Sequence, residues 1–202
     1  MPMNSNKTDV YVALVPDTDG EAPLYPAERD RAVRETANPT LRRARYFVWR
    51  LLELAIRESL GLTLAEAGLR LDGGRWSSET VDFSLSHGGG ALAVAISSAH
   101  VGVDIELLDG ERDSARVAER FFNAEEREEY LSAPESERLP AFLRIWTAKE
   151  AVFKSQGSAT FAPSSVDSHS RTVRTESLLL GGRQYILSIA SDNETLIHTV
   201  EL

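Results

Sequence analysis

Two carboxylates stand two residues apart in the run Gly102-Val-Asp-Ile-Glu106. On a β-strand, residues i and i+2 share a face, so Asp104 and Glu106 are expected side by side while Val103 and Ile105 face the core. Neighbouring anions repel each other, and a cation relieves the repulsion. Such oxygen ligands suit Mg²⁺, which is usually held by one or two carboxylates with substrate phosphates and water. The alternative is a strand with a solvated outer face, and the segment taken alone favours it.

A second candidate segment runs from Trp146 to Lys154. Glu150 and Lys154 are four residues apart, so on a helix they share one face, and Trp146 lies one turn earlier on it. A Glu–Lys pair at this spacing is commonly only a surface stabiliser. Here, however, the pair lies among apolar residues, and Lys154 and Lys149 are two of only three lysines beside nineteen arginines. Glu150 could complete a site with the two strand carboxylates, and Lys154 could meet a phosphate as a point charge.

Two further groups could bind an anion. Ser86 and His87 precede three glycines, so a hydroxyl, an imidazole and turn amides could cradle a phosphate, although a polar hairpin turn is the simpler reading. A hydrolase triad is not indicated, because adjacent strand residues face opposite sides and no G-x-S-x-G turn surrounds Ser86. Arg45 belongs to a set of helix arginines that could pair with phosphate, or that could form a solvated face.

Composition excludes several classes of protein. The chain has 22 basic and 31 acidic residues, a net charge of −9 and no cysteine. Disulfide scaffolds, thiol catalysis and Cys-based zinc sites are therefore ruled out, and an acidic chain is a poor non-specific binder of nucleic acid. No apolar run is long enough for a membrane helix, and the first residues lack the features of a signal peptide. We therefore expect a cytoplasmic protein that contacts neither nucleic acid nor membrane.

The elements that must position these residues can be predicted from hydrophobic periodicity and from capping and turn residues. Asn38 and Pro39 predict the start of a long helix that ends at Gly61. Helices are also expected over 26–36 and 114–122, after Asn123, and from about 140. Strands are expected over 10–15, 81–86, 91–96 and 101–106, the last three as antiparallel neighbours, and the tail over 172–202 reads as an antiparallel meander.

The order of these elements predicts an α+β fold made of two similar halves. Each half would pack a long helix on a small antiparallel sheet, and a pseudo-twofold axis would relate the halves. We expect the N-terminal half to span residues 1–107 and the C-terminal half to span residues 108–202.

In this order the segments resemble the 4'-phosphopantetheinyl transferase superfamily, in its monomeric, pseudo-dimeric class. The motifs that carry the resemblance are Phe83-Ser-Leu-Ser-His87, Val101-Gly-Val-Asp-Ile-Glu106, Arg120-Phe-Phe122, Trp146-Thr-Ala-Lys-Glu-Ala151 with Lys154, and the helix run from Arg45 to Leu52. The resemblance implies transfer of the phosphopantetheine arm of coenzyme A to a serine of an acyl, peptidyl or polyketide carrier protein, in fatty-acid, polyketide or nonribosomal peptide synthesis. Adenosine 3',5'-bisphosphate would be released, and the active site and coenzyme A cleft would lie between the halves.

The resemblance also implies roles for individual residues. Asp104, Glu106 and Glu150 would hold Mg²⁺ on the pyrophosphate, Lys154 would contact it, and Glu150 would act as base, directly or through a water. Ser86 and His87 would lie against the adenosine 3'-phosphate end, with phosphate or nucleotide contacts from Arg45 and Arg75. Separately, an acidic carrier protein would need a local basic or apolar patch on a chain of net charge −9, and the helix arginines and the pair Phe121 and Phe122 are candidates for it.

Two positions depart from the family pattern. Gly88 follows His87 where a small polar residue is usual, and Trp76 follows Arg75 where proline is frequent. Two other functions stay open: a non-catalytic module of the same fold that binds coenzyme A or a carrier protein, and a different Mg²⁺-dependent enzyme acting on a diphosphate.

Overall fold

The computed structural model describes residues 6–109, 113–157, 162–169 and 172–202. The helices are α1 (Ala27–Arg34), α2 (Pro39–Leu60), α3 (Ser114–Phe121), α4 (Ala124–Ser132) and α5 (Arg138–Ser155), with short 3₁₀ turns at Glu135–Glu137 and Pro163–Ser165. The strands are β1 (Lys7–Leu14), β2 (Arg70–Asp72), β3 (Arg75–Ser77), β4 (Asp82–Gly88), β5 (Ala91–Ser97), β6 (Gly102–Leu107), β7 (Val173–Leu180), β8 (Arg183–Ala190) and β9 (Glu194–Thr199).

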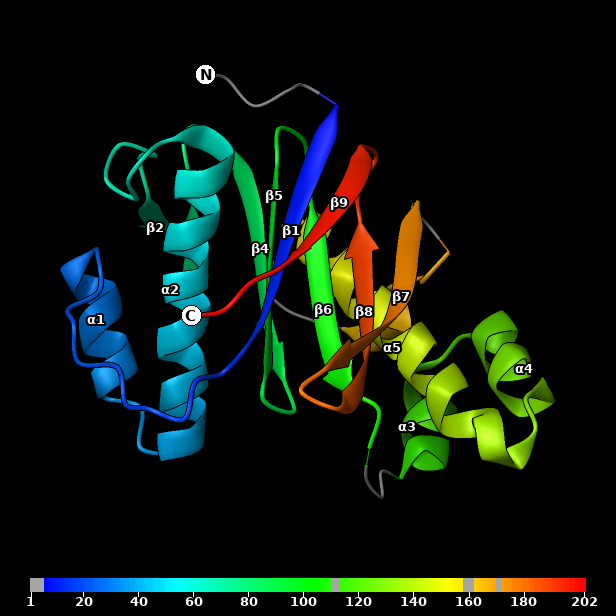
Figure 1. The fold of residues 1–202 in the computed structure, drawn as a ribbon. Helices are drawn as coiled ribbons and strands as arrows, with labels where there is room; N and C mark the ends of the chain where they lie inside the picture. The colour runs from blue at the N-terminus through cyan, green and yellow to red at the C-terminus, as the bar shows by residue number, and fades with distance from the viewer. Residues whose placement is uncertain (1–5, 110–112, 158–161, 170–171) are drawn as a thin grey trace.

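Four layers make up the molecule: helix, sheet, sheet, helix (Figure 1). The first sheet has the strand order β4-β5-β1-β9, and the second has the order β6-β8-β7; β2 and β3 form a separate small hairpin. Helix α2 covers the outer face of the first sheet and α5 covers the outer face of the second. An apolar core that includes Val12, Ala93, Ile105 and Leu187 fills the space between the sheets. The predicted α+β class is confirmed.

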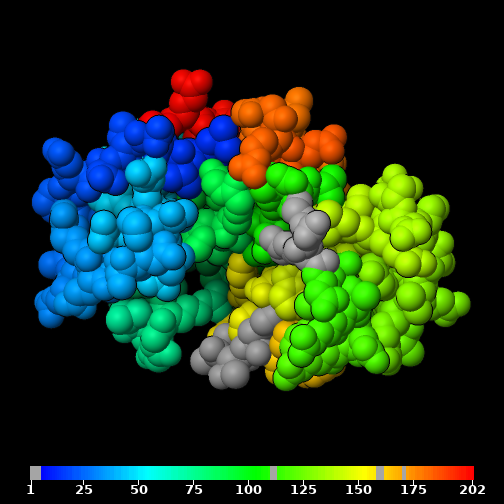
Figure 2. Space-filling view, turned by 90° about the horizontal axis from the view of Figure 1, so that it is seen from below, coloured from blue at the N-terminus to red at the C-terminus, as the bar shows by residue number. Residues whose placement is uncertain are grey.

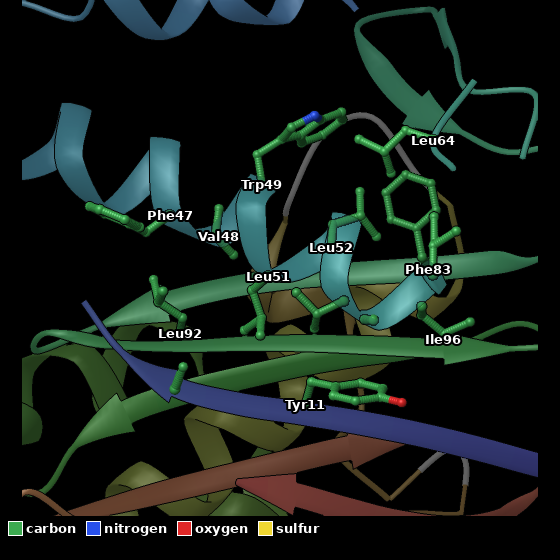
Figure 3. Close-up of a cluster of buried hydrophobic side chains, with 14 of the residues drawn as sticks. Tyr11, Phe47, Val48, Trp49, Leu51, Leu52, Leu64, Phe83, Leu92 and Ile96 are labelled. Atoms are coloured by element: carbon green, nitrogen blue, oxygen red, sulfur yellow. The ribbon is translucent and has the colours of Figure 1, made fainter. Parts of the chain in front are cut away.

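Helix α2 forms where its capping signals predict. The Asn38 side chain accepts a hydrogen bond from the backbone N–H of Leu41 at 3.0 Å, and Gly61 ends the helix with a left-handed φ of 70°. One stripe of the helix is buried, including Val48, Leu51, Leu52 and Ile56. Figure 3 shows this stripe packed on Tyr11, Leu92 and Ile96 of the first sheet. The helix and the sheet therefore form one core.

Strand β6 belongs to the second sheet, where it pairs antiparallel with β8. The expectation that it would pair with β5 is wrong, because both edges of β5 are already occupied by β4 and β1. Strand β6 meets β4 through side chains instead. The backbone N–H groups of Val101, Val103 and Ile105 donate to the side chains of Asp82, Ser84 and Ser86, at 3.0, 3.0 and 3.3 Å. These contacts fix the register between the two sheets.

Strand β9 pairs in parallel with β1, so the expected three-strand meander of the tail is limited to the β7–β8 hairpin. The physical reason is the same, since β6 and β7 occupy both edges of β8. Strand pairing thus crosses the expected division at residue 107 in both directions, and the first sheet contains a parallel pair. The pseudo-twofold relation of the halves stays a prediction. Within the described ranges, no helix has the length and apolarity needed to cross a membrane.

Candidate functional site

The helix α5 and the strand β6 approach each other closely, which brings the two main motifs together. A Cβ atom at Gly102 would overlap the backbone carbonyl of Ala151, so only glycine fits at this crossing. Near this crossing, Nζ of Lys154 donates to Oδ1 of Asp104 at 2.7 Å and to the backbone oxygen of Val103 at 3.0 Å. The structure therefore joins the strand carboxylate to the helix lysine, which lie fifty positions apart in the sequence.

Asp104 is the most enclosed carboxylate of the site, with 6 % of its surface exposed. Its Oδ1 accepts from both Lys154 Nζ and Ser86 Oγ, each at 2.7 Å. Its other oxygen, Oδ2, is buried without a hydrogen-bond partner among the described residues. A buried anionic oxygen without a partner is costly and calls for an explanation, of which a bound cation is one.

The three predicted carboxylates lie within electrostatic reach of one another. The pKa of Glu150 is raised from 4.5 to about 7, first by burial and then by the negative charges of Asp104 and Glu106, against the opposing charge of Lys154. Among the described residues, however, no group of three or more Asp, Glu or His side chains is gathered closely enough to hold a metal by itself. The hard oxygens still fit Mg²⁺, because one or two carboxylates with substrate phosphates commonly suffice for it.

Gly88 lies close to Glu106, and its lack of a side chain leaves space for the glutamate. A Cβ atom at Gly88 would overlap the backbone oxygen of Ile105 and lie 3.2 Å from Oε2 of Glu106. The family pattern usually has a small polar residue at this position. Here the close packing of β4 on β6 leaves no room for a side chain.

A pocket of about 480 Å³ opens beside Lys154, a size typical of small-molecule sites. Its walls come from the β2–β3 turn, β3, β4 and α5: Gly73, Gly74, Arg75, Trp76, Phe83, Ser84, Leu85, Phe153 and Lys154. Arg75, for which the resemblance implies a nucleotide contact, lines this pocket, with its guanidinium 3.8 Å from Asp82. In the view from below, the surface is hollowed between the N-terminal part and the C-terminal helices, and yellow atoms of α5 lie at the floor of the hollow (Figure 2).

Positive charge gathers near His87. Although part of its surface is exposed, the pKa of His87 is lowered below 6.5, first by desolvation and then by the charges of Lys154 and Arg45. Arg45 itself donates from Nη1 to Thr36 Oγ1 at 3.2 Å. A second pocket, of about 600 Å³, lies between the turn that follows His87 and the first turns of α2.

Arg29 is a member of this cationic group that the sequence did not single out. Its guanidinium lies 4.6 Å from the ring centre of Trp49 and donates to the backbone oxygen of Arg45 at 3.1 Å. Its Nε is buried without a hydrogen-bond partner among the described residues. Burial, followed by the charge of Arg45, lowers its pKa to about 10. Nothing distinguishes this arginine from the other eighteen in the sequence, because only the packing of α1 on α2 reveals it.

The two candidate carrier contacts differ in exposure. Phe122 is only 4 % exposed and stacks on Phe142 with ring centres 5.5 Å apart, so its ring is unavailable to a partner, and that expectation is wrong. Phe122 follows the last residue of α3 in an extended conformation, and its ring turns into the core. Phe121 is half-buried beside Trp146, at 6.3 Å between ring centres, and the guanidinium of Arg120 lies over it at 5.0 Å.

Lys149 points away from the site. It is fully buried, and its Nζ donates to both carboxylate oxygens of Glu126, at 2.6 and 2.8 Å, and to the backbone oxygen of Val166. Glu126 also closes the predicted capping box with Asn123. Burial alone would raise the pKa of Glu126, but hydrogen bonds from Lys149, Ser168 and Asn123 outweigh it and hold the pKa below 4.5. The two neighbouring lysines thus separate into Lys154 at the site and Lys149 in the core.

Comparison with known proteins agrees with the geometry. Residues 100–197 match the family model described as the 4'-phosphopantetheinyl transferase superfamily. The 4'-phosphopantetheinyl transferase AcpT of Salmonella typhimurium is 37 % identical over 87 residues, which are 43 % of this chain and 45 % of that protein. The 4'-phosphopantetheinyl transferase psf-1 of Bacillus pumilus is 39 % identical over 75 residues, 37 % of this chain and 31 % of that protein. HetI of a Nostoc species, also named a 4'-phosphopantetheinyl transferase, is 34 % identical over 86 residues, 42 % of this chain and 36 % of that protein.

These matches span less than half the length of each relative. The matched residues begin just before β6 and include the Asp104, Glu106, Glu150 and Lys154 constellation. The match to the model of the 4'-phosphopantetheinyl transferase superfamily therefore covers the strand and helix motifs that carry most of the predicted resemblance.

Proposed function

We propose that this protein transfers the 4'-phosphopantetheine arm of coenzyme A to a serine of an apo acyl, peptidyl or polyketide carrier protein. The observation that carries the proposal is the contact between Lys154 and Asp104, because it unites the two most specific family motifs beside a pocket of ligand size. The relatives named as 4'-phosphopantetheinyl transferases support the same reaction class.

Magnesium is part of this proposal. Asp104, through Oδ2, together with Glu106 and Glu150 would hold the ion at the pyrophosphate of coenzyme A. When bound there, Mg²⁺ would neutralise the charge that develops on the phosphate of the departing nucleotide. The buried Oδ2 of Asp104, which lacks a partner among the described residues, supports this assignment.

The protein's own side chains orient the pyrophosphate and remove the proton of the carrier serine. The hydroxyl oxygen of the carrier serine attacks the phosphorus that bears pantetheine, and the bond from that phosphorus to the bridging oxygen breaks. Glu150 takes the serine proton, directly or through a water, and the electron pair leaves with adenosine 3',5'-bisphosphate. Lys154, with part of its side chain exposed beside the pocket, contributes positive charge at the pyrophosphate.

The remaining contacts belong to the nucleotide end. We place the base and ribose in the pocket formed by Arg75 and Trp76, and the 3'-phosphate among Arg45 and His87, where the local charge is positive. For the carrier protein, Arg120 and Phe121 on α3 offer a basic and apolar patch on a chain of net charge −9, which an acidic partner would otherwise avoid.

The test is direct. The protein is incubated with coenzyme A, Mg²⁺ and a panel of apo carrier proteins, and each carrier is weighed by mass spectrometry. We expect the mass gain of one phosphopantetheine on at least one carrier, and no gain with Asp104→Ala or Glu150→Ala, both of which should stay folded by circular dichroism. Coenzyme A binding without turnover on any carrier would instead favour the non-catalytic module. Release of adenosine 3',5'-bisphosphate without carrier modification would favour an enzyme acting on a diphosphate.

A further inference from the structure

Ser86 is buried between the two sheets, with 7 % of its surface exposed. Its hydroxyl donates to Oδ1 of Asp104 at 2.7 Å and accepts from the backbone N–H of Ile105 at 3.3 Å. The resemblance implies a different task, namely contact with the adenosine 3'-phosphate end of coenzyme A. The two tasks make different demands on one hydroxyl group.

A serine hydroxyl carries one hydrogen. The oxygens of an ionised phosphate ester accept hydrogen bonds and do not donate them, so a contact between Ser86 and the 3'-phosphate would need that hydrogen. In the structure the hydrogen is already given to a carboxylate, in a short bond of the charge-assisted kind. Binding the phosphate would therefore release Asp104.

Two donors converge on the same oxygen of Asp104. Ser86 Oγ and Lys154 Nζ both lie 2.7 Å from Oδ1, and they approach from different layers of the fold, β4 and α5. Together they fix the rotation of the carboxylate. Oδ2, which has no hydrogen-bond partner among the described residues, is thereby left for another ligand.

We infer that Ser86 is a positioning residue, which holds Asp104 by Oδ1 so that Oδ2 is presented to the divalent cation, and that it does not contact the 3'-phosphate of coenzyme A. This inference rests on the proposed function for the identity of the nucleotide and the ion. Outer partners that orient a metal ligand typically change metal affinity about 10–100-fold when they are removed.

Ser97 supplies a control of the same type on the neighbouring strand β5. It is fully buried, and its hydroxyl accepts from Thr8 Oγ1 at 2.9 Å and from Asn193 Nδ2 at 3.0 Å. It lines neither of the two pockets of the candidate site, and the structure gives it no hydrogen bond to Asp104 within the described ranges. Ser97→Ala therefore reports the cost of removing a buried serine hydroxyl outside the site.

The experiment measures Mn²⁺ affinity, by the electron paramagnetic resonance signal of the free ion, in the presence of either coenzyme A or 3'-dephospho-coenzyme A. Calorimetry gives the affinity for each nucleotide without metal. For Ser86→Ala we expect Mn²⁺ to bind about 10-fold or more weakly with both nucleotides. The preference for coenzyme A over its dephospho form should stay as in the wild type, and Ser97→Ala should keep the Mn²⁺ affinity of the wild type.

The opposite pattern would overturn the inference: Ser86→Ala with unchanged Mn²⁺ affinity, or with the preference for the 3'-phosphate abolished. If the Ala variant does not fold, Ser86→Cys replaces it, since a thiol has similar volume but is a weak donor and the chain has no other cysteine. It too should lose Mn²⁺ affinity while retaining the preference. Both readouts are equilibrium measurements, so they stand even if no carrier protein is modified.

Discussion

The ammonium group of Lys154 lies 2.7 Å from Oδ1 of Asp104, and this contact ties α5 to β6 at the centre of the candidate site. The same ammonium donates to the backbone oxygen of Val103 at 3.0 Å. A compact cation on a flexible stem fits between these two acceptors, whereas a planar guanidinium spreads its donors over a wider fork. This relationship gives a physical reason for lysine at position 154 in a chain that has nineteen arginines and only three lysines.

We therefore predict that Lys154→Arg weakens transfer, although charge is conserved. The guanidinium cannot satisfy Asp104 Oδ1 and the Val103 carbonyl from one nitrogen, so the carboxylate should rotate and the pyrophosphate should lose its point charge. We expect kcat/KM for coenzyme A to fall about 10-fold or more, equivalent to at least about 1.4 kcal/mol. Lys7→Arg, on the surface of β1, is the control and should keep the wild-type value. Equal kinetics in both variants would contradict this role for Lys154.

The buried pair of Lys149 and Glu126 should matter for stability. Lys149→Met leaves the Glu126 carboxylate buried without its cation, which typically costs about 3–5 kcal/mol. Urea unfolding monitored by fluorescence measures the loss. The double variant Lys149→Met/Glu126→Gln should recover part of it, because the glutamine amide removes the buried charge and keeps an oxygen for Ser168. A double variant less stable than Lys149→Met would argue against this explanation.

Local signals in the sequence predicted much of this structure. The caps at Asn38 and Gly61 fixed the ends of α2, the Gly181-Gly182 turn marked the β7–β8 hairpin, and the Gly102–Glu106 run formed the expected strand. Each of these features is determined by residues that are close together in the sequence. The alternation on β6 correctly assigned Val103 and Ile105 to the core.

What the sequence could not predict depends on contacts between distant residues. Strands β6 and β9 joined other sheets than expected, because the choice of a free sheet edge is decided by strands far away in the chain. The hydroxyl of Ser86 and the pairing of Lys149 with Glu126 likewise join segments 18 and 23 residues apart. Hydrophobic periodicity carries no information about which polar partner a side chain will meet.

The raised pKa of Glu150 leads to a prediction about pH. In the unfolded chain this carboxyl ionises near 4.5, and in the folded metal-free protein it ionises near 7. Between these values the folded state holds more protons than the unfolded state, so the contribution of Glu150 to stability is complete below pH 4.5 and is lost as the pH rises through 7. Glu150→Gln removes this loss, and should raise the free energy of unfolding at pH 8 by about 1–3 kcal/mol.

Thermal unfolding in the presence of a chelator tests that prediction. The melting temperature of Glu150→Gln should exceed that of the wild type at pH 8, and the difference should nearly vanish at about pH 4.5. Glu128→Gln, on the exposed face of α4, should show no such dependence. If the wild type were the more stable of the two at pH 8, burial and the neighbouring charges would not disfavour the ionised carboxylate of Glu150.

Gly102 provides the last prediction, because it sets the distance between α5 and β6. A Cβ atom there would overlap the backbone carbonyl of Ala151 and lie 2.7 Å from the amide nitrogen of Ser155, so Gly102→Ala must push the helix outward. We expect a destabilisation of about 1–3 kcal/mol, as for other overpacked positions. Transfer activity should fall further than this loss of stability alone would explain, because Glu150 and Lys154 move with the helix and away from Asp104.

Gly61→Ala is the matched control for this change. Gly61 has open space around it but a left-handed φ of 70°, so the added methyl group costs about 1 kcal/mol through backbone strain alone. Both variants are assayed for transfer well below their melting temperatures, after urea unfolding has given their stabilities. Gly61→Ala should keep wild-type transfer at a similar loss of stability. If Gly102→Ala also keeps it, the close crossing of α5 over β6 is not what assembles the site.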